Sequence, residues 1–179
     1  MTEAEYLAWD DVQELKHEFD GLRPVAMVGA TTDHDRIRGN LYFELNGRLR
    51  GGPCEPFGPD MRVPTGRGRY RYPDAVVTCT PVAGGSRDIS APVIIFEVLS
   101  ESTYEADCGS KLVEYRSIPS LIRHVMLEQT VRMATVITRA GDIWSIDVLR
   151  SDETQTLPEL GIEIPLPYLY IRTAAATDT

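Results

Sequence analysis

The sequence predicts one mixed α/β (α+β) domain over residues 1–179, in which helices flank a mixed central β-sheet. The chain has 179 residues, of which 42% are hydrophobic and 25% charged, as expected for a single globular core. Residues 92–100, PVIIFEVLS, form an apolar run with one charged residue, which is typical of a strand buried on both faces. Ile and Leu recur every four residues from 37 to 49, which indicates a helix with one apolar face.

The first third of the chain is expected to form two helices around a short strand. A capping-box pattern at the start and apolar residues at helical spacing predict a helix over residues 3–18, ended by Gly21. Residues 22–28 have the composition of a short strand. A second helix is expected over residues 33–50, because Gly-Gly-Pro at 51–53 would stop it.

The rest of the chain is expected to supply most of the sheet. Short strands separated by turns are predicted within residues 54–79, and the last of them, over 73–78, precedes the central strand. A helix is expected near residues 108–117. The Pro-rich segment IPLPYLY should pack a last turn on the sheet, and the tail from about residue 174 should fray. Three further strands are predicted over residues 122–127, 132–138 and 143–149.

Charge and cysteine content narrow the classes of function. The net charge of −9 opposes nonspecific attraction to nucleic acid, so DNA binding would need a local basic patch. The chain has no apolar run long enough to span a membrane, and its acidic start differs from a signal peptide, so the cytoplasm is the expected location. Three widely spaced cysteines without a CxxC pair predict reduced thiols rather than a zinc site or a disulfide: Cys54, Cys79 and Cys108.

Two carboxylates are expected at one end of the sheet. Glu97 interrupts the buried strand, where an unpaired charge would cost several kcal/mol, so it needs a cationic partner or a metal ion. Asp74 begins the preceding strand, and pairing of the two strands would bring the carboxylates together as ligands for a cation such as Mg²⁺. Asp107, Lys111 and Tyr115 share a helix face that could add a lysine to orient or activate water.

Several short motifs resemble, in the right order and over nearly the whole chain, the PD-(D/E)XK nuclease superfamily and, more narrowly, its Uma-type branch of restriction-endonuclease-like proteins. They are HEFDG at 17–21, HDRI at 34–37, YPD at 72–74, FEVLS at 96–100, ST at 102–103, and Lys111 with Tyr115.

The resemblance implies a restriction endonuclease-like fold and a Mg²⁺-dependent endonuclease acting on DNA, with Mn²⁺ as an alternative metal and a homodimer as the assembly common in such enzymes. It implies that Asp74 and Glu97 bind the metal, with the Val98 carbonyl as a third ligand. Glu18 would be the extra acid that the first helix of this fold sends toward the metal. The usual lysine position, two residues after the glutamate, holds Leu99 here, and Lys111 on the following helix would take over its role.

Plainer roles stay open for most of these residues. Glu97 could pair with an arginine, Lys111 with Asp107, and Tyr115 could belong to the core. His34 could meet a phosphate or cap its helix. Arg67, Arg69 and Arg71 alternate with Gly68, Tyr70 and Tyr72, so they could form a phosphate-contacting edge or a solvated hairpin face.

At two places the sequence departs from the branch: Glu101 stands for its usual proline, and Arg123-His124 for its Glu-Tyr pair. The acidic balance also leaves open a catalytically inactive nuclease-fold protein that acts as a nucleic-acid-binding or protein-interaction module.

Overall fold

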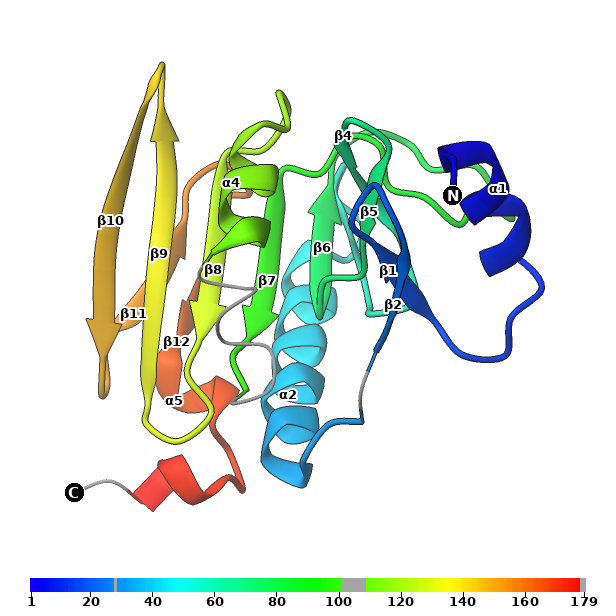
Figure 1. The fold of residues 1–179 in the computed structure, drawn as a ribbon. Helices are drawn as coiled ribbons and strands as arrows, with labels where there is room; N and C mark the ends of the chain where they lie inside the picture. Colours follow the sequence, from blue (N-terminus) through cyan, green and yellow to red (C-terminus); the bar gives the residue numbers. More distant parts are fainter. Residues whose placement is uncertain (28, 101–108, 178–179) are drawn as a thin grey trace.

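The computed structural model describes residues 1–27, 29–100 and 109–177, and its centre is a six-stranded mixed sheet (Figure 1). Strand β7 (Ile94–Val98) lies inside this sheet, antiparallel to β6 (Ala75–Thr78) and parallel to β8 (Arg123–Leu127). All five residues of β7 are buried, which confirms the predicted central strand. The sheet has the order β10-β9-β8-β7-β6-β3 and is completed by β3 (Glu55–Phe57), β9 (Met133–Ala140) and β10 (Ile143–Arg150).

Two helices cover opposite faces of this sheet, and α4 (Ser110–Arg116) covers the face turned to the viewer in Figure 1. Helix α2 (Thr32–Leu49) presents its buried Ile and Leu stripe to Ile94, Phe96 and Val98 of β7. Ile95 packs with Tyr115 of α4 on the other face. Since side chains alternate along a strand, Glu97 points to the same side as Ile95 and therefore toward α4.

A second, four-stranded sheet has the order β2-β1-β5-β4 and packs against α1 (Glu3–Asp10). Tyr6 of α1 stacks on Phe19, with ring centroids 4.5 Å apart, and also contacts Tyr70. These rings form a small apolar cluster apart from the main core. The four strands are β1 (His17–Phe19), β2 (Pro24–Ala26), β4 (Val63–Gly66) and β5 (Arg69–Arg71).

The predicted helix over residues 3–18 is wrong in its second half, because the helix ends at Asp10 and residues 17–19 form β1. The helical spacing continues through Val12 and Leu15, but these side chains are 77% and 70% exposed, so no packing supports a longer helix. Pairing with β2 and β5 instead satisfies the backbone of residues 17–19.

Other differences also come from pairing between distant segments. Cys54 and Cys79 form a disulfide, which contradicts the expected reduced thiols. Antiparallel pairing of Glu55 with Thr78 brings the two cysteines opposite each other across β3 and β6, a proximity that their 25-residue separation hides. Cys108 lies outside the described residues. The hairpin of β11 (Thr154–Leu157) and β12 (Ile162–Pro165) was not predicted, whereas the last turn is observed as α5 (Leu166–Leu169), before a 3₁₀ helix (Ala174–Thr177).

The predicted strands after Pro119 are confirmed as β8, β9 and β10, and the predicted second helix is confirmed as α2. Thr31 caps α2, since its hydroxyl accepts a hydrogen bond from the His34 backbone N–H at 3.2 Å. Among the residues that the structure describes, no helix is long and apolar enough to cross a membrane.

Candidate active site

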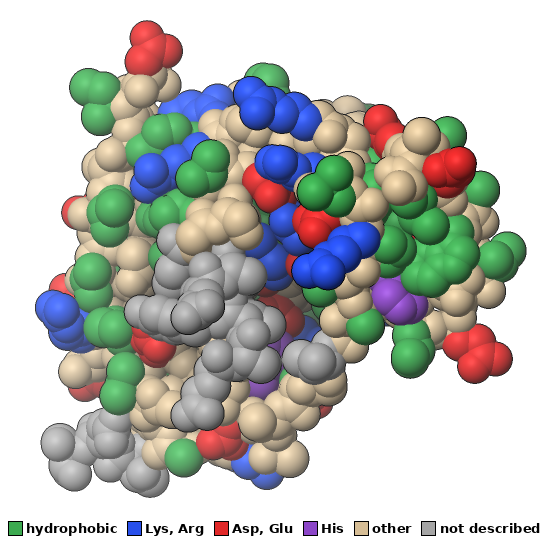
Figure 2. Space-filling model, viewed as in Figure 1, with side chains coloured by type: hydrophobic (Ala, Val, Ile, Leu, Met, Phe, Trp, Pro, Cys, Tyr) green, Lys and Arg blue, Asp and Glu red, His purple; other side chains and the backbone are tan. Residues whose placement is uncertain are grey.

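A cleft of about 1380 Å³ opens where the two sheets and the helices α2 and α4 meet. Its walls come from β1, β2, the first turn of α2, the end of β7, the start of α4 and the turn after β8. Figure 2 shows acidic and basic side chains crowded together near the middle of this face. A cleft of this size with ionisable groups in its wall is the natural candidate for an active site.

Asp74 and Glu97 lie side by side in the wall of the cleft. Ala75 of β6 pairs with Phe96 of β7 in the antiparallel register. Asp74, which precedes Ala75, therefore lies opposite Glu97, which follows Phe96. The Asp74 backbone N–H points to Glu97 Oε2 at 3.4 Å, and Asp74 Oδ2 accepts a hydrogen bond from the Val98 backbone N–H at 2.8 Å. The Glu97 side chain is only 4% exposed. The expected carboxylate pair is thus present as a geometric feature.

Lys111 and Tyr115 of α4 both reach Glu97. The Tyr115 hydroxyl donates to Glu97 Oε1 at 2.7 Å, and Lys111 Nζ lies 3.6 Å from the same oxygen. Both residues are buried, and their spacing of four positions places them on one face of α4. Asp107, expected on this face, lies outside the described residues, as do Glu101, Ser102 and Thr103.

Glu18 reaches the cleft from strand β1 and not from a helix, which corrects the predicted element. Its Oε1 lies 2.9 Å from Lys111 Nζ and its Oε2 accepts from Arg71 Nη1 at 3.1 Å. Strand β1, inside the second sheet, rather than the first helix therefore brings this acid to the site.

His34 lies in the first turn of α2, with Nε2 3.3 Å from Asp74 Oδ2. Its Nδ1 is buried and has no hydrogen-bond partner among the described residues. The structure therefore places His34 beside Asp74 in the cleft, where a residue that contacts the substrate would have to lie.

The expected arginine stripe is only partly available to a substrate. Arg67 is exposed in the turn between β4 and β5, and the Arg69 side chain is 37% exposed. Arg71 is buried and donates to both oxygens of Glu114, at 2.8 and 2.7 Å. Alternation does put residues 69 and 71 on one face, but α4 covers the inner part of that face and supplies a buried acid.

Glu114 was missed by the sequence reasoning, although it follows Lys111 by three positions and so lies on the same side of α4. It also accepts from the Thr65 hydroxyl at 3.1 Å, and Arg69 Nη1 lies 3.7 Å from its Oε1. The spacing to Lys111 was the available signal. The sequence does not show that Glu114 pairs with Arg71 on β5.

His124 lies behind the site on β8, fully buried, with its ring edge-on to Tyr115 at 5.1 Å between centroids. Burial, followed by the positive charges of Lys111 and Arg116, lowers the pKa of His124 to about 3. The ring is therefore neutral at pH 7.

The cleft supplies oxygen ligands but few of them. Within residues 1–27, 29–100 and 109–177, no three His, Cys, Asp or Glu side chains are grouped as a metal site. Asp74, Glu97 and Val98 do line the cleft together. Mg²⁺ is often held by one or two carboxylates and completes its shell with water and substrate phosphate, so the donor set fits this hard cation.

Comparisons with known proteins agree with this fold. The model of the family Uma2, described as "Putative restriction endonuclease", matches residues 3–167. The uncharacterized protein slr1290 of Synechocystis sp. is 28% identical over 95% of this chain and 91% of its own length. A second Synechocystis protein, sll1609, is 29% identical over 79% of this chain and 82% of its own length.

A solved structure shares the fold. The crystal structure of "a putative nuclease belonging to DUF820" from Anabaena variabilis superimposes with a TM-score of 0.79 and covers 95% of this chain and 97% of that chain. Its sequence identity is 14%, so the likeness concerns the fold. The restriction endonuclease-like mixed sheet expected from the sequence is thus found.

Proposed function

This chain belongs to the Uma2 family, and we propose that it is a metal-dependent endonuclease that hydrolyses DNA phosphodiester bonds with Mg²⁺ or Mn²⁺. One observation carries the proposal: Asp74, Glu97 and Lys111 converge in a single cleft. Paired acids beside a lysine suit phosphodiester hydrolysis, in which charge must be neutralised on the phosphate and a water molecule must be oriented.

Asp74, Glu97 and the Val98 carbonyl are the proposed metal ligands. The described carboxylates and cations that line the cleft number five and two, a formal excess of three negative charges that a divalent cation would reduce: Glu18, Asp35, Asp74, Glu97, Glu128, Arg38 and Lys111. When bound, the metal would act as a Lewis acid toward the phosphate and the attacking water.

Lys111 is the proposed group that orients the attacking water, because its ammonium lies at Glu97 and faces the cleft. Hydrolysis joins the water oxygen to phosphorus and releases the leaving ester oxygen, which gains a proton. The positive charge of Lys111 would stabilise the negative charge that develops on the phosphate in this step. Glu18 would hold Lys111 in place.

Contacts to the DNA are proposed from His34 and the exposed part of the arginine stripe. Tyr115, which was also expected to contact the substrate, is fully buried and donates its hydroxyl to Glu97, so it is not kept as a DNA contact. His34 lies in the cleft beside Asp74, while Arg67 and Arg69 lie on the β4–β5 hairpin of the second sheet. Such a local basic edge could attract phosphates despite the net charge of −9. A homodimer would present two such sites to the two DNA strands.

A catalytically inactive binding module is the second candidate. One observation favours it: the acids and the lysine of the site already contact protein groups, Asp74 with His34 and Val98, and Lys111 with Glu18. This candidate predicts DNA or protein binding that does not change when Asp74 is replaced.

Cleavage of plasmid DNA with Mg²⁺ or Mn²⁺ tests the proposal. Asp74→Ala should lower the cleavage rate by at least about a hundredfold, and chelation of the metal should stop it. Asp147→Asn, which removes an exposed carboxylate on β10, is the matched control and should leave the rate unchanged. Undiminished cleavage by Asp74→Ala would refute the assignment.

A further inference from the structure

We propose that Arg71 is a positioning residue of this site: locked by Glu114, it fixes the Glu18 carboxylate and, through it, the Lys111 ammonium beside Glu97. The inference deepens the proposed nuclease function and rests on it for its catalytic consequence. The positioning itself can be measured without any substrate.

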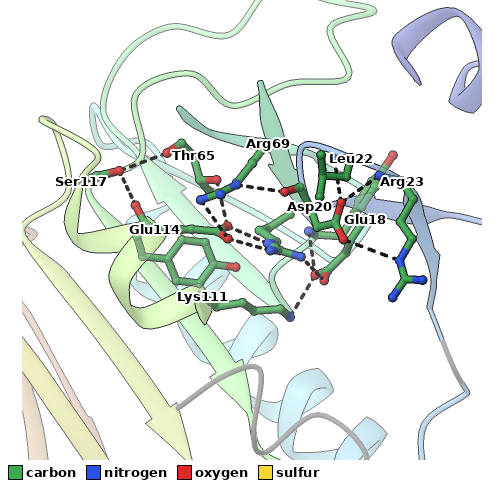
Figure 3. Close-up of polar contacts among 12 residues, drawn as sticks. Glu18, Asp20, Leu22, Arg23, Thr65, Arg69, Lys111, Glu114 and Ser117 are labelled. Carbon is green, nitrogen blue, oxygen red and sulfur yellow. Dashed lines mark hydrogen bonds and ion pairs between the residues drawn. The ribbon is translucent and has the colours of Figure 1, made fainter. Parts of the chain in front are cut away.

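The contacts form one continuous chain of charges, part of which is drawn in Figure 3. Arg71 Nε and Nη2 donate to the two oxygens of Glu114, and Nη1 donates to Glu18 Oε2 at 3.1 Å. The other oxygen of Glu18 meets Lys111 Nζ at 2.9 Å. Lys111 Nζ in turn lies 3.6 Å from Glu97. Each carboxylate oxygen of Glu18 thus faces a different cation.

Burial of these charged side chains favours one arrangement of their contacts. The side chains of Arg71, Lys111 and Glu114 are 7%, 7% and 5% exposed, so their interactions are weakly screened by water. A buried charge without its partner is costly, which favours one arrangement of the whole group. Arg71 is therefore poorly placed to meet a DNA phosphate, unlike the exposed Arg67.

Other contacts hold Glu114 in place, so Glu18 and Lys111 should depend on Arg71 more than Glu114 does. The Thr65 hydroxyl donates to Glu114, and the Ser117 hydroxyl donates to the Thr65 carbonyl at 3.0 Å, which ties α4 to β4 independently of Arg71. Glu18 stands on a three-residue strand at the edge of the cleft. Loss of Arg71 should therefore be felt at Glu18 and Lys111 more than at Glu114.

An arginine is required for this role. Its planar fork can meet two oxygens of one carboxylate and still direct a third N–H to another residue, whereas a lysine ammonium is a compact point charge. Arg71→Lys should therefore not preserve the contacts to Glu114 and Glu18.

Lysine reactivity provides the test, because the chain has only two lysines, Lys16 and Lys111. The Lys111 side chain is 7% exposed and the Lys16 side chain 41%, so Lys16 serves as an internal reference. We would acetylate the full chain briefly with an N-hydroxysuccinimide ester and measure both sites by mass spectrometry. The variant is Arg71→Met/Glu114→Gln, since removing both partners of a buried pair avoids leaving one charge unpaired.

The matched control is Arg123→Met/Glu159→Gln. This pair is also buried and bidentate, at 2.7 and 3.0 Å, but Arg123 begins β8 beside Ile94, at the end of the strands away from Glu97. Acetylation of Lys111 relative to Lys16 should rise roughly tenfold in the Arg71 variant, as expected for loss of a charge-assisted hydrogen bond, and stay unchanged in the control. An unchanged Lys111 rate in both folded variants would overturn the proposal.

Kinetics separate positioning from substrate contact. In the Arg71 variant kcat for DNA cleavage should fall about tenfold or more while KM changes little, and Arg71→Lys should not rescue it. A raised KM with a salt dependence reduced by about one charge would show instead that Arg71 contacts phosphate. If the wild-type protein cleaves no DNA, the proposed function fails, but the lysine labelling still decides whether Arg71 positions Lys111.

Discussion

The two faces of the central sheet use the same strand differently. Toward α2, β7 presents Ile94, Phe96 and Val98 to an apolar helix stripe, and that face is core along its whole length. Toward α4, Ile95 belongs to the core, but the next side chain on that face, Glu97, meets a lysine and a tyrosine. One strand therefore supplies stability on one face and a polar site at the end of the other.

This difference separates two kinds of mutational effect. Substitutions on the α2 face should lower the free energy of unfolding and spare the chemistry of the remaining folded protein. Substitutions at the polar end of the α4 face should remove activity with a smaller loss of stability.

The largest expected effect is on catalysis. Glu97→Gln keeps the size of the side chain and its contact with Tyr115, but removes the charge that would hold a metal ion and Lys111. The DNA cleavage rate should fall by about 10²-fold or more. Circular dichroism should show a folded protein, and activity near the wild-type level would show that Glu97 is not part of the site.

The next largest effect is a loss of stability on the face of the sheet that packs against α2. Leu41 is fully buried against the sheet, and Leu41→Ala should lower the free energy of unfolding by about 2–5 kcal/mol, because it leaves a cavity. Urea denaturation measures this loss. Phe43→Ala, on the exposed side of the same helix with 75% exposure, is the control and should cost far less. Equal losses in the two variants would contradict the assignment of the apolar face.

A pH-dependent effect should come from His124. Its pKa falls from 6.5 to about 3 on folding, so between these values the unfolded chain binds more protons and the folded state loses stability as the pH falls. Replacing it by His124→Leu removes this contribution. The free energy of unfolding of the wild type minus that of the variant should fall by about 1.4 kcal/mol per pH unit from pH 6 to pH 4. Parallel stability curves would contradict the buried neutral imidazole.

The smallest effect is expected at the exposed edge. Arg67→Gln should weaken DNA binding slightly and uniformly across sequences, and it should reduce the salt slope of log Kd by about one. Fluorescence anisotropy with a labelled duplex at several salt concentrations measures both quantities. A salt slope equal to that of the wild type would remove Arg67 from the proposed DNA contacts.

The part of the site that follows local periodicity could be predicted from the sequence. Alternation along β7 singled out Glu97 as a charge in a buried strand, and helical spacing linked Lys111 with Tyr115. The carboxylate of Asp74 followed from the expected pairing of consecutive strands. The first two inferences need only residues close together in the sequence, and the third needs only the pairing of two strands that follow each other along the chain.

What was missed depends on contacts between distant segments. Arg71 was expected on an exposed stripe, as a phosphate contact or as a solvated side chain, because the sequence does not show that Glu114 of α4 pairs with Arg71 on β5. Glu18 was placed on a helix because apolar spacing continued through Val12 and Leu15, which turn out to face solvent. The Cys54–Cys79 disulfide was missed because strand pairing, and not sequence spacing, brings the two thiols together.

Calorimetric titration of Mn²⁺ in the presence of a DNA duplex with non-hydrolysable phosphates tests the central claim most directly. The polar end of the α4 face should bind Mn²⁺ in the wild type, and Asp74→Ala should abolish that binding while Leu41→Ala, measured at a temperature where it is folded, retains it. Equal Mn²⁺ binding by the wild type and Asp74→Ala, or no binding by either, would contradict a metal-dependent site at Asp74 and Glu97.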